Sequence, residues 1–241
     1  WKKKLATYAS LTVLATFIIH IINKLIYFMS TIDNLLGRKE GLYYEWKFGK
    51  IFYTKEGTGK PILLIHDLSA CSSEYEWNRI VSDLSKKNTV YTLDLLGCGK
   101  SDKPNFTYTN FLYVQLVTDF INNVIGEKAD VIVTGNSCSF VLMACHNNDE
   151  IIDRILLINP PSISSISKVP TKRTKMLKFI INIPFIGTLL FNLLHSKDSI
   201  EQTFMTEYFY NPQFVDDEIV KTYCESAQIS KTQSKYLFAS I

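Results

Sequence analysis

Residues 130–139 read Asp130-Val131-Ile132-Val133-Thr134-Gly135-Asn136-Ser137-Cys138-Ser139, and this stretch decides the fold. Its first half is short, apolar and rich in β-branched residues, which predicts a buried strand. From Phe140 onward, apolar residues recur with a helical period, which predicts a helix. The small residues Gly135 and Ser139 on either side of Ser137 permit a sharp turn between strand and helix. We therefore expect Ser137 on this turn, with its hydroxyl held above the end of the sheet.

Two neighbouring registers of the turn fit less well. A turn centred on Cys138 would put Phe140 in a tight flanking position, and a turn centred on Ser139 would put Val141 there. Both side chains are too large for that place. A simpler interpretation stays open, because serine is also favoured as the cap of an ordinary helix.

Composition points to a globular protein with a sizeable core. The chain has 241 residues, of which 46% are hydrophobic and 20% charged, enough for one large α/β domain with a small appendage. A net charge of +3 without a basic stripe argues against a nucleic-acid partner. The five cysteines have no paired or Cys-x-x-Cys spacing. We therefore expect neither a metal nor a cofactor.

Residues 1–32 predict a membrane anchor helix. Lys2 to Lys4 precede an uncharged run, Leu5 to Asn23, that is about long enough to cross a bilayer as one helix. Lysines at the start favour a cytoplasmic N-terminus, so we expect a single-pass chain with an extracytoplasmic domain. A signal peptide and an interfacial helix remain alternatives, although no small-x-small cleavage site follows the run. Residues 33–41 are polar and glycine-flanked, which predicts a linker.

Residues 42–162 alternate between strand and helix patterns, which is typical of a doubly wound, mostly parallel α/β sheet. Two strand-like runs around Gly49 predict a hairpin. The expected strands are 43–48, 50–55, 62–65, 89–93, 130–134 and 155–158, and the expected helices before the Ser137 turn are 74–84 and 108–125.

Residues 163–241 predict a helical cap. Apolar stretches on both sides of Pro184 follow a cluster of basic residues. Two interpretations stay open: a pair of core-packing helices, or a lid that offers apolar surface to a substrate or a membrane.

In their order along the chain, three motifs resemble those of the α/β-hydrolase family, in its branch with a helical cap after the sixth strand. They are His66-Asp67, the D-x-x-G-x-G-x-S pattern of Asp94 to Ser101, and Gly135 to Ser139. The resemblance runs from about residue 43 to the end of the chain. It implies Ser137 as nucleophile, an oxyanion hole made by the backbone amides of Leu68 and Cys138, and a small acyl or apolar substrate. It implies structural roles for His66, Asp94, Gly97, Gly99, Ser101 and Gly135.

Serine catalysis also needs a base and a carboxylate that orients it. The four histidines are His20, His66, His146 and His195. None occupies the position that the family order of serine, acid and histidine requires, and His195 is expected at the surface or in packing. Asn159 stands where some relatives have the acid. We therefore expect a truncated sequence, with acid and histidine further on, and little or no activity from this chain alone.

Asp67 is a second departure, because the family has glycine there and a carboxylate beside the oxyanion hole opposes negative charge. The expected function is a serine hydrolase for an ester or related acyl compound, with a lipophilic one favoured by the apolar cap. Two alternatives are kept. One is a non-catalytic, hydrolase-like binding protein, and the other is a cofactor-free haloperoxidase or carbon–carbon hydrolase on the same fold.

Overall fold

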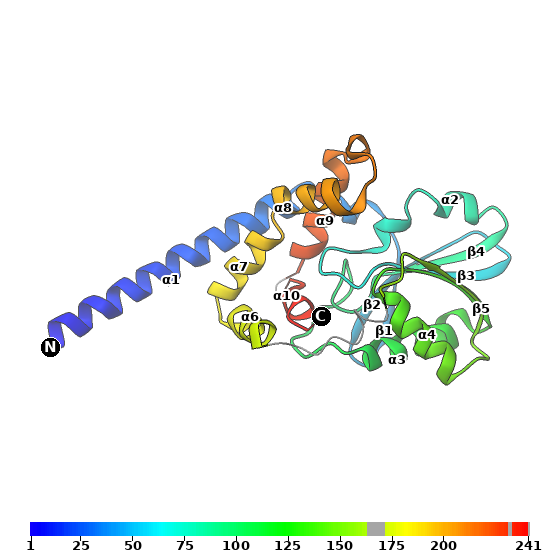
Figure 1. Cartoon of the computed structure of the whole chain (residues 1–241), viewed down its shortest axis with the longest axis horizontal. Helices are drawn as coiled ribbons and strands as arrows, with labels where there is room; N and C mark the ends of the chain where they lie inside the picture. Colours follow the sequence, from blue (N-terminus) through cyan, green and yellow to red (C-terminus); the bar gives the residue numbers. More distant parts are fainter. Residues whose placement is uncertain (163–171, 231–232, 241) are drawn as a thin grey trace.

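The computed structural model describes residues 1–162, 172–230 and 233–240, and its centre is a six-stranded sheet (Figure 1). The strands are β1 (Leu42–Trp46), β2 (Gly49–Glu56), β3 (Lys60–Ile65), β4 (Asn88–Leu93), β5 (Ala129–Thr134) and β6 (Ile152–Ile158). Their order is β1-β2-β4-β3-β5-β6. Strands β4, β3, β5 and β6 are parallel, while β1 and β2 add an antiparallel edge. The predicted mostly parallel α/β sheet is confirmed.

The hairpin of β1 and β2 also forms as expected, with Trp46 paired to Gly49. Gly49 has a φ of +148°, a backbone conformation that side chains rarely adopt. A methyl group there would lie 2.8 Å from the Asp102 Cβ. Glycine is therefore required at this turn.

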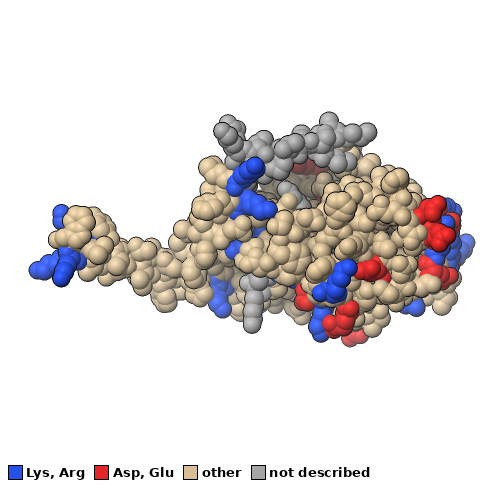
Figure 2. Space-filling model, turned by 90° about the horizontal axis from the view of Figure 1, so that it is seen from below, with Lys and Arg blue, Asp and Glu red and all other residues tan. Residues whose placement is uncertain are grey.

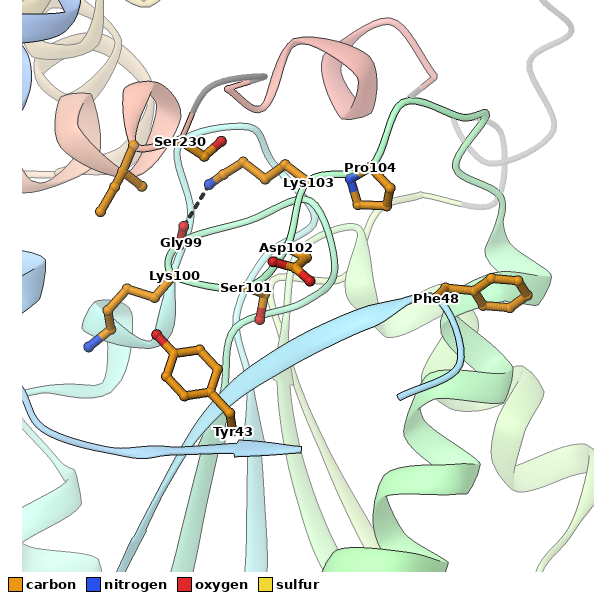
Figure 3. Close-up of a pocket in the computed structure, with 10 residues that line it drawn as sticks. Tyr43, Phe48, Gly99, Lys100, Ser101, Asp102, Lys103, Pro104 and Ser230 are labelled. Carbon is orange, nitrogen blue, oxygen red and sulfur yellow. Dashed lines mark hydrogen bonds between the residues drawn. The ribbon is translucent and has the colours of Figure 1, made fainter. Parts of the chain in front are cut away.

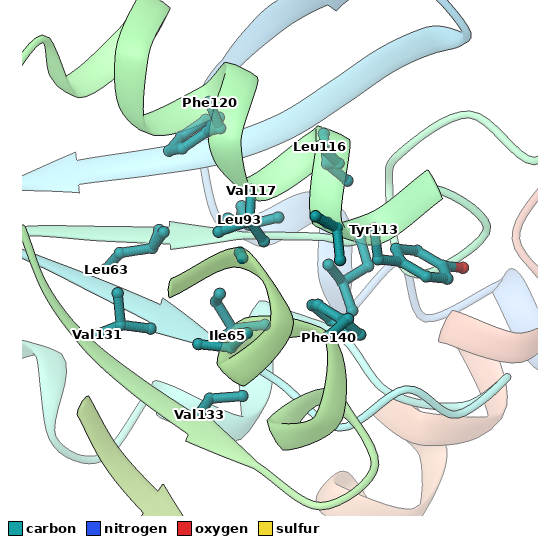
Figure 4. Close-up of a cluster of buried hydrophobic side chains, with 14 of the residues drawn as sticks. Leu63, Ile65, Leu93, Tyr113, Leu116, Val117, Phe120, Val131, Val133 and Phe140 are labelled. Carbon is teal, nitrogen blue, oxygen red and sulfur yellow. The ribbon is translucent and has the colours of Figure 1, made fainter. Parts of the chain in front are cut away.

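Helices cover both faces of the sheet, which explains why β3 is apolar throughout. On one face, Leu63 and Ile65 pack with α3 (Asn110–Phe120) and α4 (Ser137–Asn147), as Figure 4 shows. On the other, Ile62 and Leu64 pack with Trp77 and Val81. This second face is covered by the 3₁₀ turn η2 (Glu74–Trp77) and the short α2 (Val81–Leu84) instead of the single helix expected over 74–84. The helix expected over 108–125 ends in the π-helical η3 (Ile121–Ile125).

The described part of the predicted cap is helical. It contains α6 (Lys172–Asn182), α7 (Ile186–Leu194), α8 (Lys197–Thr203), η4 (Phe204–Tyr208), η5 (Pro212–Phe214), α9 (Asp217–Gln228) and α10 (Lys235–Phe238). These elements lie between the long N-terminal helix and the sheet (Figure 1). The first part of the expected cap, residues 163–171, lies outside the described residues.

Helix α1 (Lys2–Thr31) projects from the body, and only its last part packs on the cap. Figure 2 shows its long uncharged shaft with lysines at the tip. Its mean hydropathy is 1.9 over the most apolar 18 residues, none of which is buried, so by length and composition it qualifies as a membrane span or a signal sequence. The expected linker is anchored as well, because the Leu35 and Leu36 amides donate to the Glu225 carboxylate at 2.7 and 3.3 Å.

Candidate functional site

The turn between β5 and α4 lies where the sequence predicts it, and its strained residue is Gly135. Gly135 has a φ of +54°, in the left-handed region that favours glycine. Asn136 already has helical angles, and α4 begins at Ser137. Ser137 therefore lies in the first turn of the helix, two residues beyond the sharp bend.

This position turns the Ser137 side chain inward. The residue is fully buried, and its Oγ donates a hydrogen bond to the His66 carbonyl at 2.6 Å. The amide of Cys138, one of the two expected oxyanion donors, donates to the Gly135 carbonyl at 3.2 Å. The other expected donor, Leu68, is buried in the main core cluster. The structure thus brings Ser137 and His66 together, with the serine hydroxyl engaged by a backbone carbonyl.

The Asp67 side chain covers the bend. A methyl group built on Gly135 would lie 2.3 Å from Asp67 Oδ1, so this oxygen occupies the space that a side chain at the bend would take. The same oxygen accepts a hydrogen bond from the Asn136 amide at 2.7 Å. The start of a helix attracts negative charge through such amides, which accounts for the carboxylate at this place.

His66 connects the loops after β3 and β4. Its Nε2 accepts a hydrogen bond from the Leu95 amide at 3.0 Å, which leaves Nδ1 to donate to the Asp67 carbonyl at 2.7 Å. Burial lowers the pKa of His66 to about 4, so the ring is neutral near pH 7. These contacts hold the His66 ring between the two loops.

The loop from Asp94 to Ser101 is closed by its own side chains. The Asp94 carboxylate accepts hydrogen bonds from the Glu74 and Lys100 amides at 2.6 and 2.7 Å, while burial raises its pKa. Ser101 Oγ donates to the Asp94 carbonyl at 2.6 Å. Gly99 has a φ of +46°, and a methyl group there would lie 2.3 Å from the Asp94 carboxylate.

Gly97, the other glycine of that loop, packs against an aromatic ring. Its φ is +92°, and a methyl group there would lie 2.8 Å from Tyr108. Both glycines are therefore needed for the backbone conformation of the loop.

A cavity of about 640 Å³ lies between the end of the sheet and the cap. Asp67, Gly135 and Asn136 form part of its floor, and Asn159 lies beside them. Apolar cap residues in its wall include Leu194, Ile200, Phe204, Phe209 and Ile219. Ser137 is not among the described residues that line this cavity. A bound molecule would therefore meet the Asp67 carboxylate before any serine of the motif.

Among the other titratable groups that line the cavity, Glu76 and His195 were not expected there from the sequence. Glu76 Oε2 accepts hydrogen bonds from the Asp67 amide and the Thr134 hydroxyl, each at 3.1 Å, and burial raises its pKa to about 7. In the sequence, Glu76 is one polar residue of an expected helix. Only in the folded chain does the loop after β3 bring its carboxyl group to the edge of the sheet. His195 was expected at the surface or in packing, and it lines the cavity as well.

The His195 ring is enclosed by the cap. It stacks on Phe191 with ring centroids 4.2 Å apart and forms a T-shaped pair with Phe238, with centroids 4.8 Å apart. Its Nδ1 donates to the Phe191 carbonyl at 2.9 Å, and burial lowers its pKa. The ring is therefore a neutral part of the cavity wall near pH 7.

A second hollow of about 590 Å³ lies beside the Asp94–Ser101 loop (Figure 3). Two of its charged groups already have partners: Lys103 Nζ donates to the Gly99 carbonyl at 2.6 Å, and the Asp102 carboxylate accepts from the Lys50 amide at 2.8 Å. These bonds hold the loop in place. We therefore assign these residues of the hollow a structural role in holding the loop.

Comparison with known proteins agrees with this fold. Residues 62–237 match the family described as Alpha/beta hydrolase family, and the chain therefore belongs to this family. Over 86 residues it is 34% identical to 2-hydroxy-6-oxo-6-(2'-aminophenyl)hexa-2,4-dienoic acid hydrolase of Metapseudomonas resinovorans, which covers 35% of this chain and 29% of that protein. The chain thus spans about a third of the length of this curated relative.

Solved structures share the same fold. A meta-cleavage product hydrolase from Pseudomonas fluorescens IP01 has a TM-score of 0.64 at 19% identity, over 82% of this chain and 66% of that one. An epoxide hydrolase from Vigna radiata has a TM-score of 0.65 at 15% identity, over 85% and 72% of the two chains. At sequence identities this low, the similarity is evidence for a shared fold only.

Proposed function

We propose that this member of the alpha/beta hydrolase family binds a small, mainly apolar molecule in the cavity beneath its cap, with Asp67 as the polar contact. The observation that carries the proposal is the Asp67 carboxylate, which covers Gly135 and accepts the Asn136 amide hydrogen. A cavity of about 640 Å³ suits such a molecule. The curated relative described above is by name the hydrolase of a substituted hexa-2,4-dienoic acid, a small molecule, which supports the same class of ligand.

A carboxylate at this place opposes acyl transfer. An amide at the start of a helix can stabilise an oxyanion as it develops. Here the Asp67 carboxylate already accepts the Asn136 amide hydrogen, and its negative charge would repel an oxyanion that develops beside it. A ligand with a hydroxyl or N–H group would instead donate a hydrogen bond to the carboxylate. Binding is therefore favoured over serine hydrolysis.

Hydrolysis of an ester or related acyl compound by Ser137 is the second candidate. The Gly135–Ser139 motif, in a family of hydrolases, favours it. It requires the Ser137 hydroxyl to leave the His66 carbonyl and reach the cavity, with the amides of Leu68 and Cys138 as oxyanion donors. The haloperoxidase and carbon–carbon hydrolase alternatives belong with this candidate.

A matched pair of ligands tests the binding proposal in the full-length protein. We expect 1-naphthol, whose hydroxyl can donate to Asp67, to bind about tenfold more tightly than 1-methoxynaphthalene, because a hydrogen bond to a charged group contributes about 1.5–3 kcal/mol. In Asp67→Ala the two affinities should be equal. Fluorescence titration measures both. Equal affinities in the unchanged protein would contradict a role for Asp67.

A fluorophosphonate probe decides between the two candidates. The binding proposal expects the folded full-length protein to remain unlabelled. Labelling that disappears in Ser137→Ala and persists in Ser139→Ala would instead support Ser137 as a nucleophile.

We also propose that α1 anchors the chain as a single-pass helix, with the folded domain outside the cytoplasm. Its apolar, unburied shaft and its N-terminal lysines support this. Alkaline extraction should leave the full-length protein in the membrane fraction, with an N-terminal tag accessible only from the cytoplasm. Recovery of a shortened, extractable protein would indicate a cleaved signal sequence.

A further inference from the structure

We propose that the outer face of α6 and α7 rests on the lipid bilayer, so that the cavity takes its ligand from the membrane. This inference rests on α1 as an anchor and names the class of ligand for the binding proposal: a lipophilic molecule dissolved in the bilayer. We define the cap face by its exposed apolar side chains, which are Met176, Phe179, Phe185, Ile186, Leu193 and Leu194.

The cap face is continuous with the shaft of α1. The rings of His20 and Phe185 are 5.7 Å apart, and both residues line an apolar groove with Phe17. Lys24 ends the uncharged run of α1. At 1.5 Å per residue, His20 and Phe17 lie about 6 and 10 Å before Lys24 along the helix. Apolar side chains of interfacial helices reach about 5–10 Å into a bilayer. An inserted α1 would therefore carry Phe185 into the outer apolar layer.

Buried hydrogen bonds hold the cap in this position. Asn23 of α1 donates to the Phe185 carbonyl at 3.0 Å, and its Oδ1 accepts from Asn192 of α7 at 3.0 Å. Both asparagines are buried, with exposed fractions of 8% and 1%. Because such bonds are costly to break inside a protein, α7 follows the depth and tilt of α1.

The charges fit a lipid surface. Lys175 and Lys178 lie on α6 among the apolar side chains, and Figure 2 shows basic groups where the shaft meets the body. Lysines at such a level extend their ammonium groups to lipid phosphates while their stems stay in the apolar layer. The cap face thus has the mixture of basic and apolar side chains that binds a membrane surface.

Leu194 connects the cap face to the cavity. Its side chain is 44% exposed, and it also lines the cavity together with His195. A molecule leaving the bilayer along α7 would therefore reach the cavity over apolar surface. Such a route selects lipophilic ligands.

The test places a fluorescent NBD group at three exposed positions of the full-length protein in lipid vesicles, through Leu14→Cys, Phe179→Cys and Phe111→Cys. Phe179 and Phe111 are matched, because they are 70% and 69% exposed, but Phe111 lies on α3 and does not belong to the cap face. The protein with only its native cysteines, treated with the same label, supplies the background. Lipids that carry a nitroxide quencher then report contact with the bilayer.

We expect loss of fluorescence at positions 14 and 179 and none at position 111. Loss at 14 without loss at 179 would overturn the cap inference and leave the anchor intact. Absence of loss at 14 would overturn the anchor, and the inference with it. Both results leave the Asp67 binding test unaffected, so the two proposals can fail separately.

Discussion

Ser137 and Ser139 show how strongly the surroundings of a single residue decide its role. Both hydroxyls donate to a carbonyl oxygen, Ser137 to His66 at 2.6 Å and Ser139 to Asn136 at 2.9 Å. Only the first bond is buried. A buried carbonyl that loses its donor bears the full cost of desolvation, whereas an exposed one turns to water.

Replacement of each serine by alanine should therefore have unequal effects. Ser137→Ala should lower the free energy of unfolding by about 1–3 kcal/mol, because it leaves the His66 carbonyl without this donor. Ser139→Ala should change it by less than about 0.5 kcal/mol. Urea denaturation followed by circular dichroism measures both. Equal losses would argue against the structural role of Ser137.

Glu76 should make stability depend on pH. Burial raises its pKa from 4.5 to about 7, so between these values the folded protein holds a proton that the unfolded chain has released. The free energy of unfolding contributed by this group therefore falls as the pH rises through that interval. Glu76→Gln should be more stable than the unchanged protein at pH 8, by about 1–3 kcal/mol, and similar to it at pH 5.

Thermal unfolding at the two pH values measures this difference. The exposed Glu40→Gln serves as the control for loss of a carboxyl group at the surface. A Glu76→Gln variant that is equally stable relative to the unchanged protein at both pH values would refute the raised pKa.

At the scale of elements, local patterns predicted most of the architecture. Strand β3 is apolar at every position from Ile62 to Ile65 because both faces of the sheet are covered, and that pattern is visible in the sequence. The expected helix over 74–84 was broken instead. It forms two short helical turns, η2 and α2, so that Trp77 and Val81 both pack against the sheet. The break therefore depends on contacts with strands β3 and β4, which the local pattern does not show.

The Asp94–Ser101 loop offers a test at this scale with a matched glycine. Gly99 and Gly126 both have positive φ, at +46° and +78°. Gly126→Ala should cost about 1 kcal/mol for backbone strain alone, since a methyl group there meets no described atom within 4 Å. Gly99→Ala should cost at least about 2 kcal/mol more, because the methyl group meets the Asp94 carboxylate. Equal losses of stability on urea denaturation would contradict the closed loop.

At the scale of the whole molecule, a buried polar network joins helix α1 to the cap. Asn192 donates to Asn23 Oδ1 and accepts from Gln233 Nε2 at 3.2 Å, while Gln233 also donates to Gln228 at 2.6 Å. The network joins three distant parts of the chain, because Asn23 lies on α1, Asn192 on α7, and Gln228 and Gln233 five residues apart near residue 230. Asn192 therefore couples the N-terminal helix to two parts of the cap.

Asn192→Ala should loosen this junction. It removes a donor from Asn23 and an acceptor from Gln233, at a cost of about 2–4 kcal/mol. Amide hydrogen exchange in α7 and in residues 23–31 should become faster, while exchange in β3 and β5 should stay slow. The exposed Asn182→Ala on α6 is the control and should leave exchange unchanged. Unchanged exchange in Asn192→Ala would show that the network does not hold α1.

The sequence by itself determined the succession of strands and helices along the chain, the long apolar N-terminal helix, the helical character of the described residues beyond 171 and the family, because periodicity and motif spacing are local properties. Only the tertiary structure decided what faces the cavity. Strands β3 and β5 pair with Ile65 beside Val133, which brings the loop after β3 over the bend after β5. In that arrangement the Asp67 carboxylate lies above Gly135, and the Ser137 hydroxyl lies beneath the His66 carbonyl. The physical reason is that a side chain's exposure depends on the register of strands far apart in the chain.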